Sequence, residues 1–305
     1  MARIRNLFSV LLIAVICFTA VGIGVYPQEV QAEPLWPRPV ISPLPDSTAG
    51  VATPVISLDG KWKYNSAPPK DFWLNSVDPS SWKEVTVPGE LAMQNQSVGG
   101  RESPYKKQIN IPADFKGKRI ILKFEKVHTD ARVWVNGTFV RDHKGGFTSW
   151  DCDITDCVTP GKAAWVTVGV KDMPTDISNA SNYAKHNIGG ILGKVRLIAQ
   201  PKDYISRLHV VTDFDSEYKN ATLKVETAVM FNGSSAATVK FALKDPTGKT
   251  VAIKPDSVDL SPKSSGATVS IPVSAPMKWD AEHPNLYTLE ASVVVNKTTV
   301  GKTSR

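Results

Sequence analysis

The sequence predicts an all-β protein made of two consecutive β-sandwiches. From Val55 onward, short segments alternate apolar and polar residues, and Gly, Pro or Asn residues separate these segments. Alternation indicates strands with one buried face, because successive side chains of a strand point to opposite sides of the sheet. No apolar repeat with the helical period of 3.6 persists for about ten residues. The class that fits many short strands without helices is the β-sandwich.

Residues 1–32 have the organisation of a secretory signal peptide. Arg3 and Arg5 precede an apolar run from Leu7 to Val25, and the small-residue site Val30-Gln31-Ala32 follows. These are the three parts of a cleavable export signal, so we expect a secreted or extracytoplasmic protein. The apolar run is also long enough to span a bilayer, so an anchor formed by residues 7–25 is the alternative.

Composition excludes several classes of function. The formal net charge is +7, but the lysines are scattered and form no basic helix. We therefore expect no nucleic-acid partner. Phosphate-loop and dinucleotide fingerprints are absent, which predicts no cofactor. The five histidines are too dispersed for ligand spacing, which predicts no metal site.

Residues 33–54 are rich in proline and are expected to form a linker or extended arm. Proline lacks the backbone donor that a sheet needs and disrupts helices. The alternative is an arm that packs along the first domain. The prolines of this segment are Pro34, Pro37, Pro39, Pro43, Pro45 and Pro54.

Residues 55–203 are predicted to form the first sandwich. The clearest local signal is Asn136-Gly137, because this dipeptide supplies the positive φ angles that a two-residue hairpin turn requires. Pro88-Gly89 ends an earlier strand. The predicted strands, in order, are 58–64, 82–87, 119–124, the hairpin 132–140, 165–170 and 193–198.

Residues 204–305 are predicted to form an immunoglobulin-like sandwich. About 100 residues with roughly seven strands are typical of that fold. Turn signals occur at Asn232-Gly233 and at Pro246-Thr247-Gly248. No cysteine is available for a bridge between its sheets. The predicted strands are 208–211, 221–231, 237–243, 268–273 and 287–295.

Cys152 and Cys157 are the cysteines that remain after the signal peptide. In an exported protein they are candidates for a disulfide that closes a small loop. Metal binding by the pair lacks a histidine partner. Asp151, Asp153 and Asp156 surround them, but no glycine turn or distal glutamate completes a calcium loop.

The stretch from Arg119 to Thr155, with Val135-Asn136-Gly137 at its centre, resembles the sugar-binding domain of family 2 glycoside hydrolases, which include β-galactosidases, β-glucuronidases and β-mannosidases. Leu58 to Trp62, Gly189 to Leu197 and Pro284 to Tyr287 match further landmarks in the same order. The resemblance implies a jelly-roll, galactose-binding-like first domain before the immunoglobulin-like domain. It also implies a carbohydrate partner, a β-glycoside, and the possibility of a homo-oligomer.

The resemblance implies that the chemistry lies outside this chain. The family uses two barrel glutamates, an acid/base and a nucleophile, in a retaining mechanism. No position here matches either glutamate, so we expect no catalytic residue, a missing C-terminal barrel and a chain inactive alone.

The resemblance also implies candidate sugar contacts. Asn136 matches an asparagine that reaches the sugar in the β-galactosidase branch, although it is equally explained by its turn. That branch has an acid before the glycine-isoleucine entry, which this chain lacks. Tyr183, His186 and Asn187 of that segment are either sugar contacts or plain surface loop. Trp150 follows a glycine-rich loop and either stacks on a sugar or packs in the core.

Two rival functions remain open at this stage. A stand-alone carbohydrate-binding module would need an exposed aromatic platform near Trp150. A cell-surface adhesion protein would retain residues 7–25 as an anchor. A glycosidase fragment would instead carry a large apolar patch where its barrel docks.

Overall fold

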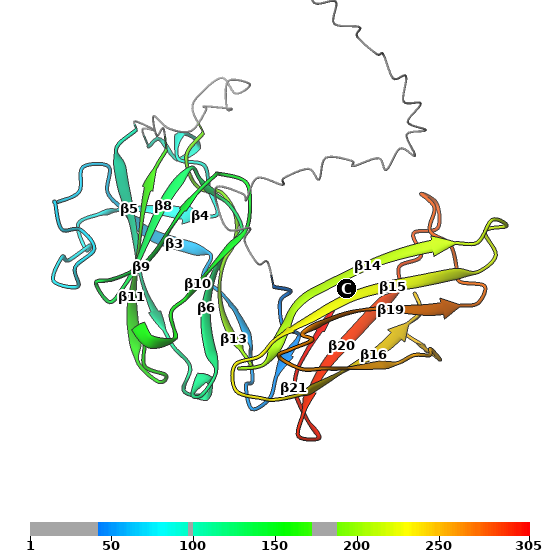
Figure 1. Ribbon diagram of the computed structural model, residues 1–305. Coiled ribbons are helices and arrows are strands. Elements are labelled where there is room, and N and C mark those ends of the chain that lie inside the picture. The colour runs from blue at the N-terminus through cyan, green and yellow to red at the C-terminus, as the bar shows by residue number, and fades with distance from the viewer. Residues whose placement is uncertain (1–41, 97–99, 173–187) are drawn as a thin grey trace, which may run out of the picture. The chain divides into compact units, whose positions relative to one another are not determined.

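The computed structural model describes residues 42–96, 100–172 and 188–305. It confirms the predicted all-β class: the described residues form antiparallel sheets, joined by turns and three single-turn 3-10 segments, η1 (Ala92–Gln94), η2 (Ala113–Phe115) and η3 (Thr155–Cys157). Figure 1 shows the strands gathered into two sandwiches along the chain. No helix within the described ranges is long and apolar enough to cross a bilayer.

The first sandwich pairs a six-stranded sheet with a four-stranded sheet. The larger sheet has the order β4-β3-β5-β11-β8-β9, and the smaller has the order β10-β6-β13-β2. The larger sheet comprises β3 (Gly60–Tyr64), β4 (Lys83–Val87), β5 (Glu102–Asn110), β8 (Asp130–Val135), β9 (Thr138–Lys144) and β11 (Ala163–Lys171). The smaller comprises β2 (Val55–Ser57), β6 (Arg119–Phe124), β10 (Trp150–Asp153) and β13 (Val195–Gln200). A short ribbon pairs β7 (Val127–His128) with β12 (Gly190–Ile191).

The core of the first sandwich lies between these sheets. Trp62, Tyr64 and Tyr105 face it from the larger sheet, while Phe124 and Trp150 face it from the smaller. All five are at most 1% exposed, so the aromatic residues that are abundant in this half of the chain mainly fill the core.

A second, smaller apolar cluster covers the outer face of the larger sheet. The connection between β3 and β4 folds back so that Phe72 and Trp82 pack with Trp134 of β8. Trp73 stacks on Trp134 with ring centroids 5.3 Å apart. The buried Lys106 side chain anchors this connection by donating to the carbonyl oxygens of Leu74 and Val77 (2.7 and 2.9 Å).

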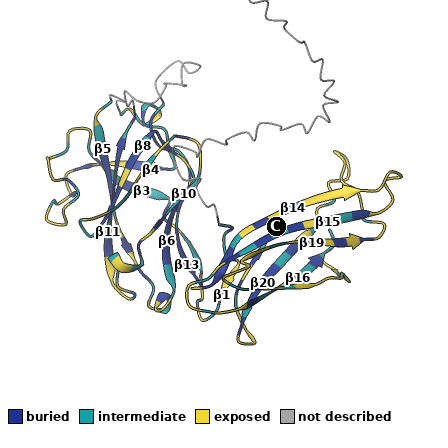
Figure 2. Ribbon diagram, in the orientation of Figure 1, coloured by how far each residue is buried: buried dark blue, intermediate teal, exposed yellow. Residues whose placement is uncertain are grey.

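The second sandwich has a three-stranded sheet, β14-β15-β19, opposite the sheet β1-β21-β20-β16-β17, whose β16 also pairs with β18. The burial pattern alternates along β15, β16 and β20 (Figure 2), and this matches the predicted one-sided strands. Its strands are β14 (Tyr204–Phe214), β15 (Ala221–Met230), β16 (Ala237–Lys244), β17 (Thr250–Val251), β18 (Ser257–Leu260), β19 (Gly266–Val273), β20 (Thr288–Val295) and β21 (Thr298–Ser304).

Part of the predicted linker contributes a strand. β1 (Ser47–Thr48) pairs with β21, and the Thr48 hydroxyl donates to the Ala199 carbonyl oxygen (2.8 Å). Residues 46–53 contain no proline, so their backbone N–H groups are free to pair. The arm is therefore tied down at this point.

Candidate functional site

Asn136 lies at the β8–β9 turn, where φ is 51° and that of Gly137 is 80°. Its side-chain Nδ2 donates to the Cys157 carbonyl oxygen (2.9 Å), and its Oδ1 accepts from the Trp165 N–H (3.0 Å). The amide thus fastens the hairpin to the connection before β11. These contacts support a structural role of Asn136 at the turn, which is the alternative to a role as a sugar contact.

Trp150 is a core residue, and the hypothesis that it stacks on a sugar is wrong for this structure. It is 1% exposed and lies between Phe124 and His143, with ring centroids 4.5 and 4.7 Å apart. Both faces of the indole are therefore covered by protein rings. Phe147 of the same loop is 58% exposed and contacts the His128 ring at 5.4 Å.

Tyr183, His186 and Asn187 lie outside the described residues, so their role as sugar contacts stays a prediction.

Cys152 and Cys157 are both free thiols, so the structure does not form the disulfide that the sequence analysis considered. The physical reason lies in their placement. Cys152 is fully buried on β10, where its partner across the ladder is Leu122, while Cys157 closes η3 and is half-buried. Burial raises the pKa of both thiols, which keeps them protonated at neutral pH.

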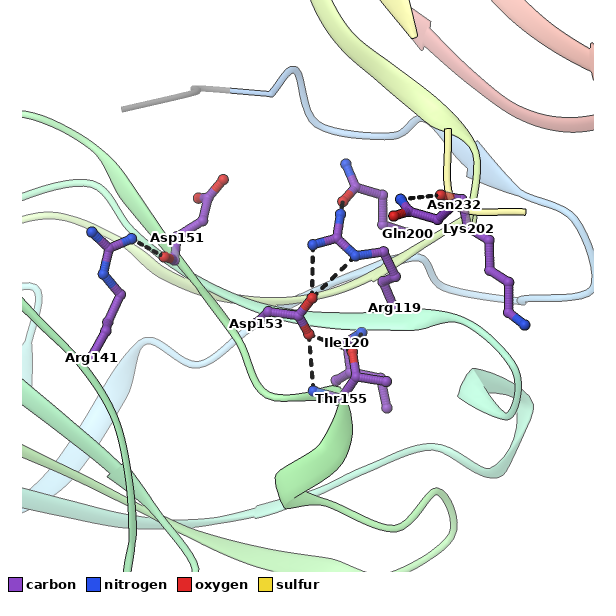
Figure 3. A network of polar contacts seen from close by, with 9 residues as sticks. All are labelled: Arg119, Ile120, Arg141, Asp151, Asp153, Thr155, Gln200, Lys202 and Asn232. Atoms are coloured by element: carbon purple, nitrogen blue, oxygen red, sulfur yellow. Dashed lines mark hydrogen bonds and ion pairs between the residues drawn. The ribbon is translucent and has the colours of Figure 1, made fainter. Parts of the chain in front are cut away.

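Two of the acidic residues around the cysteines, Asp151 and Asp153, are paired with basic neighbours. Asp153 accepts from Arg119 at 2.7 Å and from the Thr155 N–H at 3.1 Å, as Figure 3 shows. Asp151 pairs with Lys123 at 3.2 Å. Each of these two carboxylates therefore has its own basic partner.

The same network borders a cavity of about 490 Å³ with a mixed polar and apolar lining. Arg141 donates to the backbone oxygen of Asp151 (2.6 Å), and the guanidinium of Arg119 reaches Gln200 (3.4 Å) (Figure 3). Burial raises the pKa of Asp151, although nearby Lys123 and Arg141 oppose this effect. The cavity walls are thus fixed by ion pairs and hydrogen bonds.

Sequence reasoning missed a buried polar cluster around Asp172, the residue that follows β11. Asp172 is 1% exposed, and burial raises its carboxyl pKa from 3.8 to about 7, with the backbone N–H of Gly190 partly offsetting the shift. Its Oδ1 has no hydrogen-bond partner among the residues that the structure describes. The Tyr105 hydroxyl lies on the other side of Gly190, and burial raises its pKa as well. The only sequence signal was an acid directly after a buried strand.

This cluster lies where two backbone segments cross. Gly89 donates to the Ile191 carbonyl oxygen (2.9 Å) and Leu91 to that of Gly189 (3.1 Å). Glu90, whose charge faces Asp172, uses its two oxygens to accept from the N–H groups of η1 (3.1 and 2.8 Å).

The second sandwich carries an apolar groove at one of its ends, with a volume of about 560 Å³. Phe214 of β14, Trp279 and Leu286 contribute exposed apolar side chains to it (39%, 61% and 70%), and Arg305 also lines it. Such a patch is what we expect of a glycosidase fragment.

Family models match the two sandwiches one after the other. The sugar-binding domain of glycosyl hydrolases family 2 matches residues 67–201, and a second model of glycosyl hydrolases family 2 matches residues 203–305. The chain belongs to glycosyl hydrolase family 2. This confirms the resemblance that the strand and turn landmarks predicted.

Relatives of the family 2 chain include much longer enzymes. It is 27% identical over 270 residues to a β-galactosidase of Clostridium acetobutylicum, covering 79% of this chain and 29% of that protein. It is 28% identical over 244 residues to a putative β-glucuronidase of Formosa agariphila, covering 78% of this chain and 29% of that protein. The chain thus spans less than a third of the length of these relatives.

Solved structures share the fold of the family 2 chain. A β-glucuronidase of Bacteroides uniformis superposes with a TM-score of 0.72 at 22% identity, covering 82% of this chain and 32% of that one. A family 2 member from Bacteroides cellulosilyticus gives the same TM-score and identity, covering 83% and 36%. At this identity the likeness establishes the fold alone.

Proposed function

We propose that this chain is the non-catalytic N-terminal part of a secreted, retaining glycosidase that hydrolyses β-glycosides, with a β-galactosidase as the model. The observation that carries the proposal is the consecutive match of two family 2 domains in a chain that spans less than a third of its relatives. The catalytic glutamates then belong to polypeptide that lies outside residues 1–305.

In the complete protein the first sandwich forms part of the substrate-binding wall. Three features support a rigid scaffold: the core between its sheets, the Asn136-anchored hairpin and the Asp172-centred crossing. A rigid scaffold suits this role, because sugar hydroxyls are selected by polar groups held in fixed positions. The relatives include both β-galactosidases and a putative β-glucuronidase. The property to determine is therefore whether the substrate sugar carries a hydroxymethyl group or a carboxylate at C6.

The rival function of a stand-alone binding module gains no support at Trp150. That hypothesis required an exposed aromatic platform, and the Trp150 ring is covered on both faces.

Export remains part of our proposal on the basis of residues 1–32, and N-terminal sequencing of the exported protein checks it. A mature chain that begins at Glu33 is the expected result.

Hydrolysis tests the function. The 305-residue chain and a chain extended by the polypeptide encoded after Arg305 are incubated with p-nitrophenyl β-D-galactoside and β-D-glucuronide. We expect release of p-nitrophenol by the extended chain alone, and the NMR spectrum of the first product should show the β anomer, as retention requires. Activity of the 305-residue chain, or an extended chain inactive on all aryl β-glycosides, would contradict the proposal.

A further inference from the structure

Exposed apolar side chains are concentrated at one end of the second sandwich. Eleven large apolar side chains are exposed in the described part of the chain, and five of them line the 560 Å³ groove: Phe214, Tyr218, Met277, Trp279 and Leu286. The other six are distributed over the remaining surface. Isolated apolar residues on a surface need no explanation, whereas a contiguous group marks a surface that another element covers.

The floor of the groove is continuous with the core of the second sandwich. Leu243, Val273 and Leu289 line it from three different strands and are 2–8% exposed. The exposed side chains above them therefore extend the core outward at a place where none of the described residues covers the sandwich. An element that binds there would bury both the exposed side chains and the floor residues beneath them more fully.

The wall of the groove is held in a fixed conformation. Asn285 Nδ2 donates to the Lys278 carbonyl oxygen (2.8 Å), and the Tyr287 hydroxyl accepts from the Met277 N–H (3.0 Å). An isolated bridge joins Trp279 to Pro284. Because these bonds order the wall in advance, binding of an occupant costs little ordering entropy in the wall.

Charge limits the chemistry of the occupant. Lys278 and Arg305 line the groove, and none of its lining residues is acidic. The groove thus fits an apolar surface with acidic side chains or carbonyl oxygens at its edge.

Arg305 lies on the wall of the groove. Its N–H donates to the Leu289 carbonyl oxygen (2.9 Å), and the Leu289 N–H donates to the carbonyl oxygen of Arg305 (2.7 Å). Any polypeptide joined to Arg305 therefore begins on this wall. A segment tethered at this point has a high effective concentration over the groove.

We infer that the Trp279–Leu286 groove is the docking surface for the polypeptide that follows Arg305 in the complete family 2 protein, and that this polypeptide presents an apolar surface with acidic groups at its edge. The inference rests on the proposed function. It goes further by assigning the interface to one end of the second sandwich and to named side chains.

Thiol labelling tests the docking surface. Leu286→Cys is made in the 305-residue chain and in the chain extended past Arg305, and labelling by a maleimide is timed. Phe139→Cys is the matched control, since Phe139 is similarly exposed (53%) but lies on β9 of the first sandwich. The unsubstituted chains give the background from Cys157 and, where residues 1–32 are retained, from Cys17. We expect labelling of Leu286→Cys to slow about tenfold or more in the extended chain, because burial requires an opening step.

Each outcome decides the inference. Equal labelling of Leu286→Cys in both chains would overturn it, as would a reading frame that stops after Arg305. Protection already present in the 305-residue chain, together with a dimer in analytical ultracentrifugation, would assign the groove to a second copy and overturn it too. Glycoside hydrolysis separates the two proposals: an extended chain that is protected but inactive contradicts the function alone, and one that is active but unprotected contradicts the docking surface alone.

Discussion

The Asp172 carboxylate lies directly against Gly189: a Cβ atom built on Gly189 would stand 2.6 Å from Asp172 Oδ1. Side-chain atoms do not approach that closely, so the absence of a side chain at position 189 is what allows the carboxyl to sit beside the crossing backbone. Two segments far apart in sequence, 89–91 and 189–191, meet at this point.

Gly189→Ala should destabilise the protein by about 1–3 kcal/mol, because the added methyl group must displace a buried carboxyl. Urea unfolding followed by tryptophan fluorescence measures the change. Gly266→Ala is the matched control, since its added Cβ would meet ordinary contacts at 3.4 and 3.6 Å. An equal loss of stability in both variants would show that the contact at Asp172 is not tight.

Asp172 should make stability fall as pH rises. Its carboxyl has a pKa of about 7 in the folded protein against 3.8 for the free group, so the folded state binds more protons between these values. The contribution of Asp172 to the free energy of unfolding therefore decreases from about pH 4 to pH 7 and is lowest above pH 7. Asp172→Asn removes this titration while keeping an oxygen for the Gly190 N–H.

The measurement is the difference in unfolding free energy between Asp172→Asn and the parent, taken from urea melts at several pH values. We expect the variant to become more stable relative to the parent by about 1–4 kcal/mol between pH 4 and pH 8. A difference that does not change with pH would mean that Asp172 is ionised throughout.

Asn136→Ala should cost about 1–3 kcal/mol of stability, because it leaves the Cys157 carbonyl oxygen and the Trp165 N–H without their side-chain partner. Asn296→Ala is the control: Asn296 has a similar φ of 49° in the β20–β21 turn and an exposed side chain. It isolates the cost of placing alanine at positive φ. If both variants lose the same stability in thermal melts, the anchoring role of the Asn136 amide is refuted.

Lys106→Met should loosen the connection between β3 and β4. Methionine matches the length of the lysine stem but leaves the carbonyl oxygens of Leu74 and Val77 without a donor, at about 1–3 kcal/mol. The Trp73–Trp134 stack reports on the connection, so its near-UV circular dichroism should weaken. Lys63→Met is the control, since Lys63 makes one long bond (3.4 Å) at the surface. An unchanged spectrum in Lys106→Met would contradict this account.

Local patterns were sufficient to predict the fold class. Alternation along β15 and β16 predicts one-sided strands, and Asn136-Gly137 predicts the β8–β9 turn, because strand period and turn geometry are properties of neighbouring residues. One of the family landmarks, Val135-Asn136-Gly137, lies at this turn.

Contacts between distant residues were not accessible from local patterns. The meeting of Asp172 with Gly189 depends on how the backbone crosses in three dimensions, and the burial of Trp150 depends on His143 from another strand. Sequence spacing alone also placed Cys152 and Cys157 within reach of a disulfide, whereas Cys152 points into the core. The candidate site was therefore predicted less completely than the fold.

The central claim is that this chain supplies the non-catalytic domains of a longer family 2 glycosidase. Determining the coding sequence beyond the codon for Arg305 tests it most directly. We predict that the reading frame continues through alternating strands and helices and contains two glutamates in a barrel, as the retaining mechanism requires. A stop codon immediately after Arg305 would contradict the claim.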